Sequence, residues 1–172
     1  MKLTFYFVIT PKRRSLRAWI TSGVIRWFEG KSFNHVFAVG EGADATKKCW
    51  NIFSWRKPWL EYEPQNVIDA YDTMKCVEIE VTSEEYTLFS DALSGLVNRH
   101  YAVGRLLLIP LYRATRWSFL TKLPGVTCTD GVAHGLQSAG LWKCDVPPEM
   151  AGLEEVESVV DMLRTARDRS LN

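Results

Sequence analysis

Short apolar runs, rich in aromatic and β-branched residues and separated by polar turns, fill much of the first half of the chain. Such runs are typical of β-strands. The strands are expected at residues 3–10, 33–39, 48–55 and 75–81. Glycines follow the second run, so the second and third strands are expected to form a hairpin. In the last run valine and isoleucine alternate with glutamate, which indicates a strand with one buried face.

Apolar residues at helical spacing, together with residues typical of helix ends, predict that helices occupy most of the remainder. They are expected at residues 15–28, 82–98, 101–111, 127–140 and 152–167. Thr82 with Glu85, and Thr127 with Asp130, form the capping-box pattern that marks a helix start. The 15–28 helix is expected to carry one apolar stripe, made of Leu16, Trp19, Ile20, Val24 and Trp27.

Proline positions complete the expected organisation. Pro64 is the expected first residue of a short helix in an otherwise irregular stretch, and Pro110 is expected to end the 101–111 helix. The Pro147-Pro148 pair is read as a linker, and residues 113–123 as a basic and aromatic connector. The sequence therefore predicts one α+β domain over residues 1–172, in which helices pack on a small antiparallel sheet.

Composition narrows the classes of protein that fit. Apolar residues make up 47% and charged residues 24% of the 172 residues, which is typical of a globular chain with an adequate core. The net charge of +1 favours neither nucleic acid nor a membrane as a partner. The four cysteines form no C-x-x-C pair, which argues against a zinc ribbon, and no metal or cofactor is expected. We expect a cytoplasmic or virion-associated protein, because no signal peptide or transmembrane segment is visible.

Cys128 is the first candidate for chemistry. If Thr127 caps the helix, Cys128 lies in the first turn, where backbone N–H groups and the helix dipole favour a thiolate. A nearby imidazolium would lower the thiol pKa further, whereas the charge of Asp130 would oppose this. The alternative is a buried structural cysteine at a helix start.

His35 is the second candidate. It lies within a predicted strand and shares a face with Phe33 and Phe37, so it is either the base for a cysteine nucleophile or an ordinary core histidine. The other histidines fit less well. His100 follows a helix end, and His134 lies six positions along the Cys128 helix, which turns it away from the thiol.

A catalytic histidine needs a third group to orient its ring. Asn51, on the strand expected to pair with that of His35, is the first choice because it can face the same way and adds no charge. Ser54 is the second choice and Glu61 the third. Asn51 could equally be an ordinary polar strand residue.

The order of these motifs resembles a known family. Asn34-His35-Val36 comes first, a strand with Asn51 follows, and a segment with His100-Tyr101 precedes Cys128-Thr129-Asp130 at a helix start. This resembles the circularly permuted branch of the NlpC-type papain-like superfamily, which is related to lecithin retinol acyltransferase. Ordinary papain-like enzymes run Cys, His, polar residue, whereas the permuted branch runs His, polar residue, Cys. The likeness spans about residues 15–150, and it implies a permuted papain-like (NlpC-type) fold.

The chain also departs from the pattern of that family. The third residue is commonly an acid or a histidine where this chain offers Asn51, and Thr127 stands where an aromatic residue often precedes the cysteine. The resemblance implies that Cys128 is the nucleophile, His35 the general base and Asn51 the orienting residue. The implied activity is that of a cysteine hydrolase, a peptidase or amidase, acting on amide bonds such as those of cell-wall peptides.

Two other functions stay open at this stage. The apolar run at residues 106–111 could dip into a lipid interface, which would suit a lipid-directed acyltransferase or lipase with the same Cys–His pair. A non-enzymatic structural module of a phage tail or similar assembly would leave Cys128 incidental. The expected partners are a peptide or peptidoglycan-like substrate and, for the structural module, other proteins of a virion or cell-wall-penetrating assembly.

Overall fold

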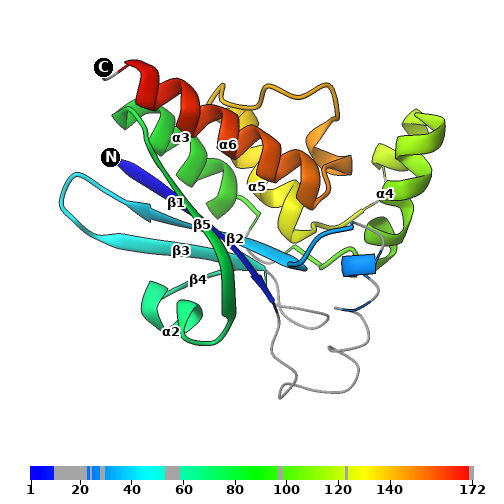
Figure 1. The fold of residues 1–172 in the computed structure, drawn as a ribbon, viewed down its shortest axis with the longest axis horizontal. Coiled ribbons are helices and arrows are strands. Elements are labelled where there is room, and N and C mark those ends of the chain that lie inside the picture. The colour runs from blue at the N-terminus through cyan, green and yellow to red at the C-terminus, as the bar shows by residue number, and fades with distance from the viewer. Residues whose placement is uncertain are drawn as a thin grey trace.

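The computed structural model describes residues 1–9, 23, 25–27, 30–52, 59–96, 99–122 and 124–170. It has the predicted α+β architecture, with a five-stranded antiparallel sheet and helices on both of its faces. The helices α3, α5 and α6 lie along one face, and the short α2 lies on the other (Figure 1). No helix within the described ranges is long and apolar enough to cross a bilayer.

The sheet has the strand order β4-β3-β2-β1-β5. Its strands are β1 (Lys2–Ile9), β2 (His35–Glu41), β3 (Lys47–Ile52), β4 (Trp59–Tyr62) and β5 (Asp72–Glu80). The four strands predicted from sequence are confirmed, including the β2–β3 hairpin, in which Ala38 pairs with Trp50. The sequence missed β4, which was expected to be irregular. Its pairing with β3, and not its own four residues, defines it as a strand.

The described helices are α2 (Pro64–Ile68), α3 (Ser83–Ser94), α4 (Val103–Thr115), α5 (Cys128–Ser138) and α6 (Leu153–Ser170), with 3₁₀ turns η1 (Ser118–Lys122) and η2 (Pro148–Met150). Both predicted capping boxes are present, and Pro64 opens α2 as predicted. α3 ends at Ser94, four residues before the expected end. Most of the expected 15–28 helix lies outside the described residues. Trp27, the last residue of the expected apolar stripe, is helical and 78% exposed.

Two prolines behave differently from the expectation. Pro110 does not end a helix but lies inside α4, although an interior proline costs a helix about 3 kcal/mol. Burial of the flanking Ile109 and Tyr112 against η1 and η2 offsets that cost. Pro148, expected in a linker, is buried and opens η2. Tertiary packing therefore determines the helical conformation at both prolines.

Two layers of core hold the sheet. The larger layer packs the aromatic side chains of β1 and β3 against α3, α5 and α6. Within it α3 and α5 approach so closely that a Cβ on Gly135 would lie 2.7 Å from the Phe89 ring. The smaller layer joins Phe37 and Cys49 to Val67 of α2. Because α5 is wedged between α3 and β2, its N-terminus is fixed beside the first residues of β2.

Candidate active site

Cys128 is the first residue of α5, as the sequence predicted. The Thr127 hydroxyl accepts a hydrogen bond from the Asp130 backbone N–H at 3.1 Å. The Asp130 carboxylate in turn accepts one from the Thr127 N–H at 2.7 Å. This reciprocal pair fixes the first turn and therefore the direction in which the Cys128 side chain leaves the helix.

Hydrogen-bond donors from three parts of the chain converge on the Cys128 sulfur. They are the backbone N–H groups of Val36 and Thr129 and the hydroxyl of Tyr101. Each lowers the pKa of the thiol, because each favours the thiolate. Val36 directly follows His35 in β2, so the thiol contacts the β2 backbone one residue after the candidate base, whose ring packs with Phe37 and Tyr71.

The pKa of the Cys128 thiol is nevertheless raised, to about 11. Burial is the main cause, since the residue is only 2% exposed, and the charge of Asp130 adds to it. The expectation of a lowered thiol pKa is therefore wrong for this structure, although the expected opposing effect of Asp130 is confirmed. A protonated thiol at neutral pH needs a base that removes its proton as it attacks.

The predicted contact between His35 and Asn51 is confirmed. The imidazole Nε2 lies 2.5 Å from Asn51 Oδ1, and both side chains are buried. The Asn51 amide nitrogen donates to the Tyr71 hydroxyl at 3.4 Å, which leaves its oxygen to accept from His35. Nε2 then carries the hydrogen of a neutral imidazole, and Nδ1 carries the lone pair that can accept a proton.

Among the other residues considered from sequence, the described ones do not join this arrangement. Ser54 and the side chain of Glu61 lie outside the described residues. His100 is exposed, and His134 lies 3.7 Å from Glu149, on a different side of α5 from the thiol.

Two tyrosines complete the surroundings of the pair, and the sequence assigned a role to neither. The Tyr71 ring stacks on the His35 ring with centroids 5.3 Å apart. Tyr101 lies beside Val126 in an isolated parallel bridge, which places its hydroxyl at the Cys128 sulfur. Burial raises the pKa of Tyr101 well above its ordinary value, so the hydroxyl stays protonated and donates. The only signal for it in the sequence was its place next to His100 in the order of motifs.

A buried ion pair ties α4 to the start of α5. Arg105, in the first turn of α4, donates to the Asp130 carboxylate at 2.5 Å, and the two side chains are 5% and 1% exposed. Burial raises the pKa of Asp130 to about 7, although the charge of Arg105 and the Thr127 N–H lower it. The pair was not anticipated, because its partners lie 25 residues apart on different helices.

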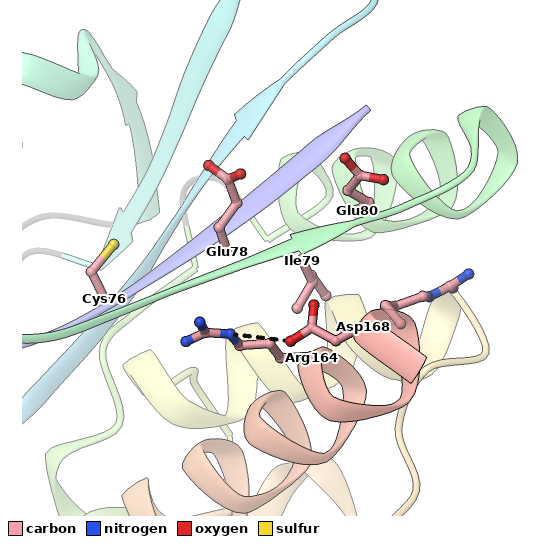
Figure 2. A pocket seen from close by; sticks show the side chains of 7 residues that line it. Cys76, Glu78, Ile79, Glu80, Arg164 and Asp168 are labelled. Carbon is pink, nitrogen blue, oxygen red and sulfur yellow. Dashed lines mark ion pairs between the residues drawn. The ribbon is translucent and has the colours of Figure 1, made fainter. Parts of the chain in front are cut away.

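A separate pocket of about 360 Å³ lies between β5 and α6. Figure 2 shows Glu78 and Glu80 on one side of β5, with Arg164 and Asp168 on the facing helix. Its arginines are engaged, since Arg167 pairs with Glu85 and Arg164 with Asp168. Because β1 separates β5 from β2, this pocket does not adjoin the Cys128–His35 region.

The buried thiols predict a pH dependence of stability. Burial raises the pKa of Cys49 to about 12 and contributes most of the rise of Cys128 to about 11, from an ordinary 9.0. Well below pH 9 both thiols keep their protons in the folded and the unfolded chain, so they do not change the free energy of unfolding. Above it the unfolded chain releases protons that the native chain retains, and the free energy of unfolding falls. Urea unfolding midpoints at about pH 8 and about pH 11 should show this fall.

Other groups also titrate in that range, so Cys49→Ala is the matched comparison. The variant should lose less stability over the same pH interval than the unaltered protein does. An identical decline in both proteins would contradict the raised pKa of Cys49.

Within the described parts of the chain, no group of three or more histidine, cysteine and acidic side chains is arranged to hold a metal ion. Comparison with known proteins found no matching family model, no matching curated protein and no matching solved structure. The site is therefore interpreted from its own geometry.

Proposed function

We propose that this protein is a cysteine hydrolase of the permuted papain-like type, with Cys128 as nucleophile, His35 as general base and Asn51 as the residue that orients the imidazole. One observation carries the proposal: Asn51 holds the Nε2 side of His35, and the residue after His35 donates its N–H to the Cys128 sulfur. A histidine fixed through one nitrogen, on the strand whose next residue contacts a thiol at a helix start, supports a thiol attack in which the imidazole accepts the proton.

The reaction starts from a neutral thiol, because burial keeps the Cys128 pKa high. His35 Nδ1 takes the thiol proton while the sulfur bonds to the substrate carbonyl carbon, which gives a tetrahedral oxyanion. The imidazolium then protonates the leaving amine as the C–N bond breaks, and a thioester remains. His35 next removes a proton from water, the hydroxide attacks the thioester, and the C–S bond breaks. The sulfur finally recovers a proton from the imidazolium.

The substrate class rests on the resemblance to the permuted NlpC-type branch, which points to amide bonds in cell-wall peptides. Burial adds one requirement. A carbonyl carbon has to reach a sulfur on a residue that is 2% exposed, so substrate binding must move part of the cover over Cys128. Tyr101 contributes to that cover, and its hydroxyl is a donor for the negative charge that develops during attack.

The proposal predicts that Cys128→Ser abolishes hydrolysis. Purified peptidoglycan peptides are incubated with the protein, and new amine termini are measured by mass spectrometry. The variant should be slower by about 10³-fold or more, because a serine hydroxyl is a poor nucleophile in a site arranged for a thiol. Cys76→Ser, which alters an exposed cysteine away from the site, should cleave at the unaltered rate.

Intact-mass analysis at short reaction times provides a second measurement. The unaltered protein should carry an acyl group that maps to Cys128, and Cys128→Ser should carry none at that position. Equal cleavage by both proteins would show that Cys128 is a structural residue.

A further inference from the structure

The chain contains a long stretch without any acidic residue. Between Asp91 and Asp130 there is no aspartate or glutamate. The same stretch contains the basic residues Arg99, Arg105, Arg113, Arg116 and Lys122. The near-neutral charge of the whole protein therefore conceals a strongly basic segment, which includes α4 and η1.

Large apolar side chains are exposed in this same segment. Leu111, Trp117 and Phe119 are 39%, 51% and 58% exposed. The rings of Trp117 and Phe119 lie together, with centroids 5.6 Å apart. α4 stands at one end of the molecule, away from the sheet (Figure 1). Paired aromatic rings at a protruding end are typical of a contact surface.

The exposed side chains are held in place from below. Ile109, Tyr112 and Leu120 are buried against Val146 and Met150. Leu120 is only 3% exposed, although Phe119 beside it points outward. Because the inward side chains of α4 and η1 already fill this small core, Trp117 and Phe119 cannot enter it without displacing them.

The basic side chains of the segment also fall into two groups, one held in ion pairs and one exposed. Arg105 is buried against Asp130, and Arg113 is engaged with Glu155 of α6. Arg116 and Lys122 are exposed and form no ion pair with any side chain that the structure describes. The Arg116 guanidinium lies 5.6 Å from the centre of the Tyr112 ring, a cation–π distance. Along the chain, the exposed aromatic residues Trp117 and Phe119 therefore lie between two exposed basic residues, Arg116 and Lys122.

We propose that Leu111, Arg116, Trp117, Phe119 and Lys122, here called the α4–η1 patch, dock this protein on a bilayer surface that contains anionic lipids. Tryptophan and phenylalanine favour the boundary between headgroups and acyl chains. Each lysine or arginine near an anionic leaflet adds about 1 kcal/mol of attraction. The proposed contact is with the bilayer surface, where aromatic rings and cations lie at the level of the headgroups.

The docking surface is joined to the candidate active site. Tyr101, which donates to the Cys128 sulfur, lies two residues before α4 begins, and Arg105 fixes the first turn of α4 to α5. The inference does not rest on the proposed hydrolase activity, since it uses none of the residues assigned to catalysis.

Flotation with vesicles tests the proposal. The full chain is mixed with vesicles made of equal parts phosphatidylcholine and phosphatidylglycerol, and should float with them at low salt. It should float less with phosphatidylcholine alone, and less at high salt because salt screens the cations. The double variant Trp117→Ala/Phe119→Ala should bind at least about tenfold more weakly. Arg116→Gln/Lys122→Gln should bind about 25-fold more weakly to the anionic vesicles, and its binding to phosphatidylcholine vesicles should not change.

Two controls make the result specific. Leu88→Ala/Met162→Ala removes comparably exposed apolar side chains from α3 and α6, and should bind as the unaltered protein does. Cys128→Ser should also bind fully, so loss of hydrolysis and loss of docking are separate outcomes. Absence of flotation with anionic vesicles would overturn the proposal, as would unchanged flotation of the Trp117 and Phe119 variant. The unaltered protein could also self-associate without lipid. If the Trp117 and Phe119 variant abolished that self-association, the patch would instead bind a second copy of the chain.

Discussion

Replacing His35 by glutamine is expected to slow amide hydrolysis by about 10²–10⁴-fold. The glutamine amide keeps an N–H that can donate to Asn51, but it cannot accept the Cys128 proton. Because burial raises the pKa of Cys128 to about 11, very little thiolate exists at neutral pH without a base. The measurement is kcat/KM on the peptide that the unaltered protein cleaves, with the unfolding midpoint as a check that the variant folds. A stable variant with full activity would exclude His35 as the base.

Asn51→Asp separates a positioning role from a structural one. The aspartate keeps an acceptor for His35 Nε2 and so should retain much of the activity. Its negative charge stabilises the imidazolium and raises the pKa of His35. The acidic limb of the pH–rate profile, where the base gains its proton, should therefore move to higher pH. A purely structural Asn51 would change stability and leave that limb where it is.

Arg105→Met is expected to destabilise the fold by about 3–5 kcal/mol. The substitution keeps an unbranched apolar side chain but leaves the Asp130 carboxylate, 1% exposed, without its cation. The pKa of Asp130, already raised by burial to about 7, would rise further. The raised pKa means that folding favours the protonated acid, so the variant should be weakest at high pH and recover as the pH falls. Urea unfolding midpoints below and above pH 7 measure both the loss of stability and its dependence on pH.

The double variant Arg105→Met/Asp130→Asn is the control for that experiment. The asparagine is neutral and keeps an oxygen that can accept from the Thr127 N–H. Much of the lost stability should therefore return, together with a loss of the pH dependence. A single variant that loses less than about 1 kcal/mol would show that the pair contributes little to the fold.

The arrangement around Cys128 gives a physical reason for this pair of residues. Asp130 caps α5 from within its first turn, but its charge also raises the pKa of the thiol two residues before it. Arg105 compensates that charge from α4. The cap thus keeps its hydrogen bonds while its electrostatic cost to the thiolate is reduced.

Local signals in the sequence determined much of this protein. Short runs rich in aromatic and β-branched residues located β1, β2 and β3, and alternation of apolar residues with glutamate located β5, which buries one face. Capping residues located the starts of α3 and α5, since a capping box is satisfied within four consecutive residues. The same short-range rules placed Cys128 in a first turn. They also put Asn51 on the face of the sheet where it meets His35.

Contacts between distant residues were decided only by the tertiary structure. β4 forms because β3 offers it a partner, and α4 passes through Pro110 because packing against η1 and η2 offsets the lost hydrogen bond. The pKa of Cys128 depends on burial, which no local pattern encodes. The pKa is therefore raised where the sequence predicted that it would be lowered. Tyr101 and Arg105 reach the site from 25 or more residues away along the chain. Local rules set each element, whereas the electrostatics of the site follow from how those elements exclude water.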